Sequence, residues 1–317
     1  MGAAAMTATP LRLGLVGCGR LAEVGYAAAA HAAQGVEIVA VTDPDRARRG
    51  LVAAKCGASG HARLDQLLAA GPLDGIIICT PPEDHEASAT AAARAGLTAL
   101  VEKPSAIDAA GALRIAALTP APWLGFNRRF DQGLQLERRM PVDGDLELQL
   151  VLHYRRKSWR PVARGDDALL DLAPHLIDLA LFLTGSLPLA VRATCTRERA
   201  GLVLATTRAE VKIECATDRT HYELVEVRRA GGKRAGRVER GGRVSGLLGR
   251  VTPRLHPLVR SLTLQLEAYG RALRGEDSGP LATAGEGAAV MQVLDAARRS
   301  DAVGGDTTAV EGVTVQR

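Results

Sequence analysis

Aromatic residues, lysines and cysteines are all scarce in this chain. Phe, Trp and Tyr make up only 3% of its 317 residues, so a hydrophobic core must consist of Leu, Val, Ile and Ala. The cysteines are odd in number, scattered and without the spacing of metal ligands, which argues against a disulfide framework or a metal centre. This usage predicts a reduced, cytoplasmic protein. The five cysteines are Cys18, Cys56, Cys79, Cys195 and Cys215.

Long apolar segments are also absent. No run of about twenty apolar residues occurs, so we expect no membrane-spanning helix. Leu15–Cys18 resembles a bacterial lipoprotein box, but no adequate apolar region precedes it, and the segment fits a first strand better. Residues 1–9 are expected to form a disordered start. The length of 317 residues predicts two domains, each large enough for its own core.

The excess of positive charge is local. The formal net charge is +5, and nine basic residues fall between Arg228 and Arg254 with Glu239 as the single acid. This stretch is rich in glycine and has no aromatic residue that could stack on a base. We therefore expect no nucleic-acid partner and predict a mobile, solvated loop or hairpin. A rim for an anionic substrate or partner is the alternative.

Strand and helix signals alternate along the first 125 residues. Such alternation is typical of βαβ units in a doubly wound parallel sheet. Three consecutive isoleucines indicate a strand that is buried on both faces, as in parallel sheets. The predicted strands are Leu11–Gly17, Val36–Thr42, Gly75–Cys79, Leu97–Glu102 and Pro122–Phe126, and the predicted helices are Arg20–Ala33, Asp45–Ala54, Leu64–Ala70, Glu83–Ala95 and Ala106–Leu118.

From about residue 127 the pattern changes to consecutive strands with short breaks. Such strands favour an open, mainly antiparallel sheet in an α+β domain. The boundary is predicted near Gly125–Asn127, which divides the chain into domains 1–126 and 127–317. The predicted strands are Leu146–Tyr154, Ala190–Cys195, Leu202–Thr207, Ala209–Ala216 and Thr220–Val227, and the predicted helices are Gln132–Arg139, Leu169–Leu183, Pro257–Leu273 and Ala284–Arg298.

A GxGxxA pattern begins at Gly17, between the first strand and the first helix. Gly17 permits a tight turn, Gly19 lets the backbone approach a pyrophosphate, and the helix N-terminus favours the phosphates. Asp43 ends the second strand, where a carboxylate can bind ribose hydroxyls and repel a 2′-phosphate. The pattern predicts NAD in preference to NADP, although Arg46 and Arg48 keep NADP open. The alternative for Asp43 is a simple turn residue.

Glu102, Lys103 and Pro104 follow a buried strand at the same carboxyl edge of the sheet, where open α/β folds bind ligands. The residue type is informative, because the chain has 35 Arg and only 5 Lys. A partly buried lysine can give up a proton, whereas arginine is effectively always charged. Lys103 is therefore a candidate acid/base group. An ion pair with Glu102 or a surface position is the alternative.

Another strand ends at this edge with Thr80 and Pro81. Thr80 and the adjacent backbone are placed to face the nicotinamide half of a dinucleotide. His85 starts the next helix, where helix capping or ordinary packing explains it equally well.

Asp171, His175 and Asp178 have the spacing of one helix face. Their directions span only about 60° on a helix, so all three could point the same way. A carboxylate beside an imidazole orients the ring and raises its basicity, which suits proton transfer at neutral pH. Structural pairing and metal binding are the alternatives, but no outside metal ligand is evident. Pro174 suggests that the helix begins close to Asp171 or bends there.

In this order, the motifs resemble the Gfo/Idh/MocA family, named after glucose–fructose oxidoreductase and inositol dehydrogenase. The resemblance runs from Leu11 to about Ala297. Its most specific parts are Gly17–Ala22, Thr80-Pro81 with His85, Glu102–Pro104, Gly125–Phe130 and Asp171–Asp178, with Glu267–Arg274 similar to a late helix of the family.

The resemblance implies a Rossmann domain and an α/β domain with a large open sheet. It also implies hydride transfer between a nicotinamide and a hydroxyl or carbonyl carbon, usually of a sugar or polyol. Lys103 and His175 would then be the polar pair at the reacting oxygen, with Asp171 binding a substrate hydroxyl or supporting them. Asn127 and Arg128 would line the cleft between the domains. The expected cofactor contacts are Gly17, Gly19, Arg20, Leu21, Asp43, Thr80, Pro81, His85, Glu102 and Lys103.

Two departures from the family pattern concern the Asp–His helix. A glycine-rich run before it is replaced by Gly165-Asp166-Asp167, and Ala173 replaces a glycine within it. The two added carboxylates could change substrate choice, for example towards amine-bearing substrates.

The function predicted from these residues is an NAD(P)-dependent oxidoreductase acting on a sugar-, cyclitol- or polyol-like substrate. A redox-neutral, NAD-recycling lyase or glycosidase is one alternative. A dinucleotide-sensing regulatory protein is another, although a sensor needs no set of proton-transfer residues. We also expect a homodimer or homotetramer, because the sheet from Leu146 onward has few helices to cover both of its faces, and an uncovered apolar face usually becomes an interface.

Overall fold

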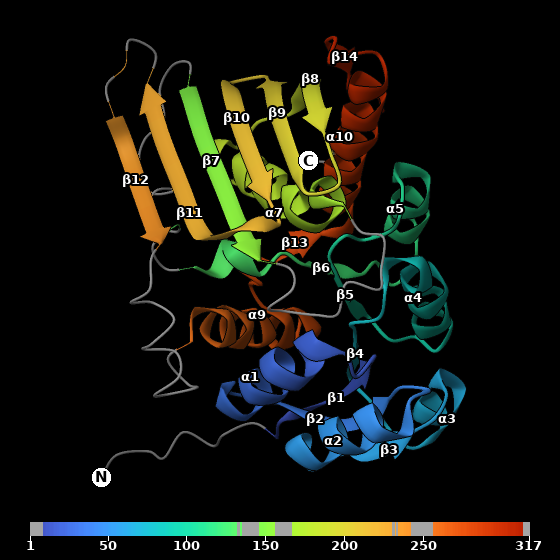
Figure 1. Ribbon diagram of the computed structural model, residues 1–317. Coiled ribbons are helices and arrows are strands. Elements are labelled where there is room, and N and C mark those ends of the chain that lie inside the picture. The colour runs from blue at the N-terminus through green and yellow to red at the C-terminus, as the bar shows by residue number, and fades with distance from the viewer. Residues whose placement is uncertain are drawn as a thin grey trace.

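The computed structural model describes residues 9–131, 134, 146–155, 167–229, 232, 234–241 and 256–312. These residues form two seven-stranded sheets, one in each half of the molecule along its long axis (Figure 1). The predicted helix Gln132–Arg139, Asp166 and residues 242–254 of the basic stretch lie outside the described residues.

The first sheet has the strand order β13-β6-β5-β4-β1-β2-β3, and β6 to β3 in that order pair in parallel. It is the predicted doubly wound sheet, with β13 as an antiparallel edge strand from late in the chain. Its strands are β1 (Leu11–Val16), β2 (Val36–Thr42), β3 (Ser59–His61), β4 (Gly75–Ile78), β5 (Ala99–Glu102), β6 (Trp123–Gly125) and β13 (Ala282–Thr283).

Helices alternate with these strands as predicted, although two of them begin irregularly. The first helix opens with a π-helical segment, η1 (Ala22–Tyr26), and the helix after β4 opens with a 3₁₀ turn, η2 (Pro82–Asp84). The α-helices are α1 (Ala27–Ala32), α2 (Arg46–Cys56), α3 (Leu64–Ala69), α4 (His85–Arg94) and α5 (Ala109–Ala116).

The register of the parallel strands brings three loops to one edge of this sheet. Val16 of β1 is paired with Ile78 of β4, which is paired in turn with Val101 of β5. The residues that follow these strands therefore lie side by side. β4 and β5 are buried along their whole length, as a sheet covered on both faces requires.

The second sheet has the strand order β12-β11-β7-β10-β9-β8-β14 and is antiparallel except for the parallel pair β7 and β10. That pair departs from simple hairpin connections, because α7 and two strands intervene between β7 and β10. The strands are β7 (Leu146–Arg155), β8 (Pro188–Cys195), β9 (Arg199–Thr206), β10 (Ala209–Ala216), β11 (Asp218–Arg229), β12 (Arg234–Gly241) and β14 (Thr308–Ala309). β12 shows that part of the basic stretch forms a hairpin.

Two helices, α7 (Ala168–Thr184) and α10 (Ala284–Ala302), cover one face of the second sheet, and no described helix covers the other (Figure 1). The alternation along β7 follows from this arrangement. Leu146, Leu148, Leu150 and Leu152 are buried in the core that contains α7, whereas Glu147 and Gln149 are exposed. The uncovered face carries exposed polar side chains such as Glu147, Glu210 and Lys212, so the expectation of an uncovered apolar face is wrong.

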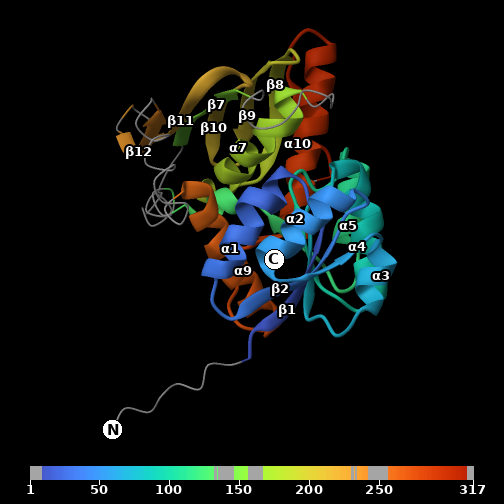
Figure 2. The same cartoon turned by 60° about the horizontal axis from the view of Figure 1, so that its bottom comes forward.

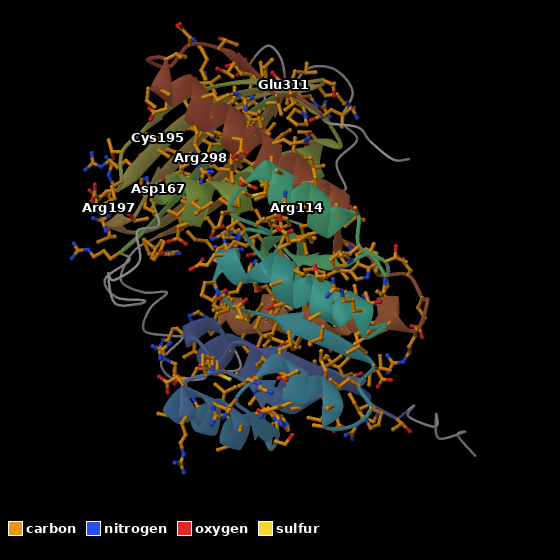
Figure 3. The ribbon with its side chains drawn as sticks, turned by 90° about the vertical axis from the view of Figure 1, so that its right-hand side faces the viewer. Arg114, Asp167, Cys195, Arg197, Arg298 and Glu311 are labelled. Atoms are coloured by element: carbon orange, nitrogen blue, oxygen red, sulfur yellow. The ribbon has the colours of Figure 1, made fainter. Side chains whose placement is uncertain are left out.

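Two late helices connect the sheets. α9 (Pro257–Leu273) packs against η1, α1 and the 3₁₀ segment η3 (Asn127–Phe130), and Figure 2 shows it beside α1. α10 packs along α5, where Arg298 donates to the carbonyl oxygen of Ile107 at 3.1 Å; Figure 3 shows Arg298 and Arg114 on these helices. The domain boundary near residue 126 stays a prediction.

Candidate active site

The glycine-rich turn after β1 is built as its sequence predicts. Gly17 has a φ of 91°, and a Cβ atom there would lie only 2.6 Å from the carbonyl oxygen of Cys79. Only glycine tolerates both conditions. Gly19 has no neighbour within 4 Å of an added Cβ, so the backbone at the helix start is open to a ligand. Arg20 is exposed beside Glu23, and Leu21 is partly buried.

Asp43 joins the glycine-rich turn to the loop after β2. Its Oδ2 accepts a hydrogen bond from the backbone N–H of Cys18, and its Oδ1 accepts one from that of Asp45, each at 2.8 Å. Asp43 therefore stabilises the turn through these two backbone hydrogen bonds. Each carboxylate oxygen still has a second lone pair, so a ribose hydroxyl can be bound by the same group.

His85 bridges two of the loops at this edge. Its Nδ1 lies 2.9 Å from the carbonyl oxygen of Pro104, and its Nε2 lies 2.9 Å from that of Thr80. Burial lowers the pKa of His85. Both ring nitrogens lie within hydrogen-bond distance of a backbone carbonyl oxygen, and the neutral ring donates to one of the two, so His85 aligns the loops. The buried Thr80 Oγ1, in contrast, has no hydrogen-bond partner among the residues that the structure describes.

Glu102 is buried behind this edge and holds three segments together. The Tyr26 hydroxyl donates to its Oε1 at 2.6 Å, and the backbone N–H of Lys103 donates to its Oε2 at 3.1 Å. Gln265 of α9 donates to the Tyr26 oxygen at 3.0 Å. Burial raises the pKa of Glu102. This network orients the backbone at Lys103, so Glu102 supports the position of Lys103 without facing the ligand side of the edge.

Lys103 reaches from the first sheet to α7. Its Nζ donates to the backbone carbonyl oxygen of Asp171 at 3.0 Å and lies 3.7 Å from Oδ1 of the same residue. The Tyr154 hydroxyl, from β7, donates to Asp171 Oδ2. Pro174 lies inside α7 and lacks an N–H group, so the carbonyl oxygen of Leu170 receives no hydrogen bond from that position. Lys103 is thus paired with Asp171 and not with Glu102.

His175 lies one turn beyond Asp171 on α7, and its buried Nδ1 has no hydrogen-bond partner in the described part of the chain. Burial lowers its pKa well below the ordinary value, and the positive charges of Lys103 and Arg128 lower it further. The ring is therefore neutral at pH 7. The expected hydrogen bond between a carboxylate and this imidazole is not formed at Nδ1.

Asp178 does not join the other two residues of the predicted face. It is 1% exposed and binds Arg129, which is 3% exposed, through contacts of 2.6 to 3.0 Å. The Arg129 guanidinium also contacts Glu286 and lies 4.7 Å from the Phe182 ring centroid. A buried guanidinium requires this degree of compensation, so Asp178 is structural. Asp178 points in nearly the same direction as Asp171 but lies about 10 Å further along the helix axis, where it meets Arg129 instead of Lys103.

Asn127 and Arg128 begin η3, directly after β6. Asn127 donates to the Ser261 hydroxyl of α9 at 3.0 Å, which anchors the segment. Arg128 donates to the Glu223 carboxylate of β11 and is close enough to His175 to affect its pKa. Asp167, one of the two added carboxylates, accepts a hydrogen bond from Leu170 N at 2.7 Å and caps α7.

Comparison with known proteins shows which family the first part of the chain resembles. Residues 11–121 match the family model GFO_IDH_MocA, described as "Oxidoreductase family, NAD-binding Rossmann fold". Over these residues the chain is similar to the Gfo/Idh/MocA family.

Two curated proteins to which the chain is similar are inositol 2-dehydrogenases. The chain is 34% identical to that of Leifsonia xyli subsp. xyli over 57% of its own length and 56% of the relative's. It is 28% identical to that of Rhizobium meliloti over 92% and 96% of the two chains. The first match thus spans just over half of the relative.

A solved structure shares the fold along almost the whole chain. The WlbA dehydrogenase from Bordetella pertussis, in complex with NADH and UDP-GlcNAcA, aligns with a TM-score of 0.79 and 21% identity over 97% of this chain and 99% of that one.

The residues at the carboxyl edge fit the dinucleotide that this family binds. Gly17 permits the tight turn, Gly19 leaves the backbone open at a helix start, and the Thr80 hydroxyl is a buried polar group without a partner among the described residues. Asp43 offers a carboxylate at the end of β2. These features match the phosphate, nicotinamide and ribose parts of NAD respectively.

The sequence did not identify Tyr26, Tyr154, Glu223 and Gln265 as part of this site. The chain has only four tyrosines, so their rarity was a signal that could have singled out the first two. Strand periodicity assigns Tyr154 to a face of β7 but does not say which residue lies opposite it.

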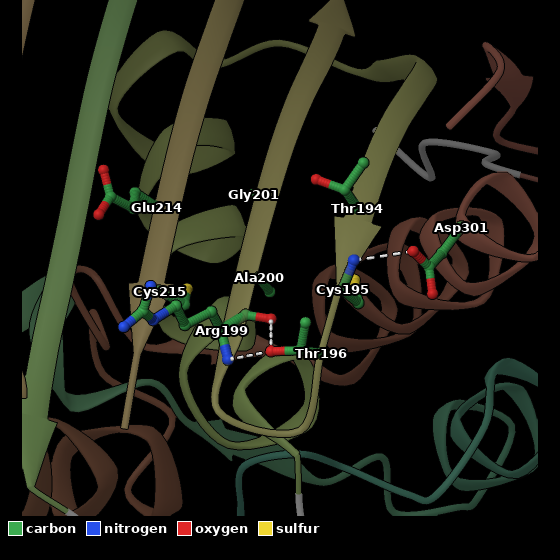
Figure 4. Close-up of a pocket in the computed structure, with 9 residues that line it drawn as sticks. All are labelled: Thr194, Cys195, Thr196, Arg199, Ala200, Gly201, Glu214, Cys215 and Asp301. Carbon is green, nitrogen blue, oxygen red and sulfur yellow. Dashed lines mark hydrogen bonds between the residues drawn. The ribbon is translucent and has the colours of Figure 1, made fainter. Parts of the chain in front are cut away.

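A pocket of about 270 Å³ lies elsewhere, at one end of β8, β9 and β10 (Figure 4). Its lining includes Cys195, whose backbone N–H donates to Asp301 Oδ1 at 2.8 Å, but none of the predicted catalytic residues. Burial and Asp301 raise the pKa of Cys195 to about 12, so this thiol is not a nucleophile at neutral pH.

The described part of the chain contains no group of three or more His, Cys, Asp or Glu residues that could hold a metal ion. Within the same residues, no helix combines the length and apolarity needed to cross a membrane.

Proposed function

We propose that this protein is an NAD-dependent dehydrogenase that transfers a hydride between the nicotinamide and a hydroxyl or carbonyl carbon of a cyclitol or sugar. The contact of Lys103 with Asp171, one helical turn from His175, carries the proposal. These groups lie at the carboxyl edge of the first sheet, beside the cofactor loops. Inositol dehydrogenation by the curated relatives and the sugar nucleotide in the WlbA complex favour this substrate class.

Lys103 and His175 would divide the handling of the substrate proton. When bound, the nicotinamide supplies the hydride chemistry. His175 is neutral at pH 7 because of its lowered pKa, so its ring can accept the hydroxyl proton during oxidation. The Lys103 ammonium can donate to the same oxygen while Asp171 holds it in place. Lys103 can exchange a proton as well, and either group can return it in reduction.

Asp171 and Glu102 would act as supports for Lys103. Asp171 holds the ammonium from α7, and Tyr154 holds the Asp171 carboxylate. Glu102 fixes the backbone N–H of Lys103 from the opposite side. A lysine side chain held at both ends loses little further conformational entropy when substrate binds. The cost of orienting this group for the reaction is therefore small.

A substrate screen tests the proposal directly. The protein is mixed with NAD or NADP and a panel of sugars and cyclitols, and NADH or NADPH formation is followed by absorbance. We expect turnover of at least one cyclitol or sugar, with NAD preferred. Retention of bound NAD without net NADH formation, together with elimination or glycoside cleavage of a substrate, would identify a redox-neutral enzyme.

We further propose that the protein is a cytoplasmic homodimer or homotetramer. The face of the second sheet that no described helix covers supports this. Because that face carries charged side chains such as Glu147, Glu210 and Lys212, an interface there would rely on complementary ion pairs. Light scattering at micromolar concentration measures the mass, and a monomer would contradict the proposal.

A further inference from the structure

Four alternating charges connect the segment after β6 to the β11–β12 hairpin. Arg128 and Asp131 belong to η3 and its C-terminal end, whereas Glu223 and Arg240 belong to β11 and β12. Arg128 donates to Glu223 Oε1, and Arg240 donates to both oxygens of Asp131. A contact of 3.6 Å between Arg240 and Glu223 Oε2 joins the two pairs. The η3 segment and the hairpin each supply one cation and one anion.

The strand register places Glu223 on the side of the sheet that faces α7. Glu223 is paired with Leu152 of β7, and side chains directly opposite each other share a face. Leu152 and Tyr154 share that face because they are two residues apart. The Tyr154 hydroxyl binds Asp171, the partner of Lys103. Glu223 is therefore directed towards the candidate active site.

Burial makes the pair of Arg128 and Glu223 electrostatically strong. The Glu223 side chain is 4% exposed and that of Arg128 is 20% exposed, so little water screens their attraction. The effect of Arg128 on the pKa of His175 shows that its charge is felt at the site. A guanidinium in this position would bind an anion if its charge were not already balanced.

The cations described around the site each have a carboxylate partner. Lys103 is paired with Asp171, Arg128 with Glu223, and Arg240 with Asp131. Among the described residues this leaves no uncompensated positive charge to attract a carboxylate or phosphate of a substrate. Hydroxyl groups, in contrast, can bind to such paired groups without disturbing the balance.

We propose that Glu223 determines the charge preference of the substrate site: by neutralising Arg128, it selects an uncharged polyhydroxyl substrate over one that carries a carboxylate or phosphate. The inference rests on the proposed function, because it concerns the same site. Such selectivity has two sources: an anionic substrate finds no free positive charge to bind, and an uncharged substrate forms hydrogen bonds with the paired groups. Removal of the Glu223 carboxylate should therefore turn Arg128 into an anion anchor.

Glu226 supplies a matched control on the same strand. Its side chain is 3% exposed and, like that of Glu223, it contacts arginines, among them Arg228 and Arg234. It lies three residues from Glu223, so it belongs to the opposite face of the sheet. Replacing either glutamate by glutamine removes one charge from β11, but only the change at residue 223 alters the partner of Arg128.

The test compares Glu223→Gln and Glu226→Gln with the unchanged protein on matched neutral and acidic sugars. The pairs are glucose with glucuronate and galactose with galacturonate, each assayed with NAD. The ratio of kcat/KM for the acid to that for the neutral sugar should rise about tenfold in Glu223→Gln, mainly through KM, and should not change in Glu226→Gln. Adding Arg128→Gln to Glu223→Gln should abolish the gain.

Titration calorimetry of the same sugars with the NADH-loaded proteins measures the preference without turnover. An unchanged protein that binds these sugars but oxidises none of them contradicts the proposed function, and the binding ratios then test Glu223 alone. A folded Glu223→Gln variant that gains no preference for the acid in either assay overturns the inference. An unchanged protein that prefers the acid overturns it as well. If Glu223→Gln does not fold, Glu223→Asp, which retracts the charge, should shift the ratio in the same direction by a smaller factor.

Discussion

The Lys103 ammonium nitrogen lies 3.0 Å from the backbone carbonyl oxygen of Asp171. Lys103 follows β5 of the first sheet and Asp171 belongs to α7, which covers the second, so this contact joins the two halves of the molecule at the carboxyl edge of β5. A ligand held by the loops after β1 and β4 would therefore lie next to the groups presented by α7. The predictions below test what this contact and its neighbours do.

Lys103 and His175 should act as one catalytic unit. Lys103→Arg keeps the charge but removes the ability to exchange a proton at neutral pH, and we expect turnover to fall by about two orders of magnitude or more with little change in NAD affinity. His175→Ala should behave similarly. The double variant should lose less than the two separate losses combined, because residues that act together are not additive.

The matched control for Lys103 is Lys55→Arg, since Lys55 forms an ion pair with Glu23 away from the site. Steady-state kinetics on a substrate from the screen, with NAD titrations, provides the measurement. Near-normal turnover of Lys103→Arg would show that Lys103 only anchors charge.

NAD should bind more tightly than NADP. The Asp43 carboxylate is held in the glycine-rich turn by two backbone N–H groups, and its negative charge would repel a 2′-phosphate. Asp43→Asn removes the charge. It should reduce the ratio of NAD affinity to NADP affinity by roughly tenfold, equivalent to about 1.4 kcal/mol. Fluorescence titration of both cofactors decides the matter. Tighter NADP binding by the unchanged protein would mean that Arg46 or Arg48 captures the phosphate.

Asp178→Asn should destabilise the fold. It removes the buried carboxylate partner of the Arg129 guanidinium and leaves only the more exposed Glu286 as a charged contact, and breaking a buried pair typically costs about 3–5 kcal/mol. Asp218→Asn, at an exposed pair with Arg199, should have a much smaller effect. Urea unfolding measures both free energies of unfolding. A free energy unchanged in Asp178→Asn, together with a large loss of turnover, would restore Asp178 to the catalytic set.

The contribution of the buried histidines to stability should be lost as the pH is lowered through about 6.5. Burial lowers the pKa of His175 and of His85, so below 6.5 the unfolded chain binds protons that the folded chain does not. Each such histidine can cost up to about 1.4 kcal/mol per pH unit. His175→Gln should therefore flatten the decline in unfolding free energy between pH 6.5 and 5, whereas replacing the exposed His31 should not. An equal slope in both variants would show that His175 titrates normally.

The sequence was sufficient to predict the elements and the positions of the cofactor loops. The GxGxxA pattern, the run of isoleucines and the alternation of strand and helix are local signals, and their order implies a parallel sheet whose loops meet at one edge. Lys103 could be selected because lysine is rare here and follows a buried strand. The short strands β3, β13 and β14 escaped prediction, since two or three residues carry too little periodicity.

Which charges meet was decided only by the tertiary structure. Asp171 and Asp178 lie on one face of α7 but meet different cations, because they are two turns apart: Lys103 contacts the first and the buried Arg129 contacts the second. The pairing of Arg128 with Glu223 joins residues 95 positions apart, a distance over which sequence periodicity conveys no information. Periodicity assigns a side chain to a face, whereas the packing of one element against another determines its partner.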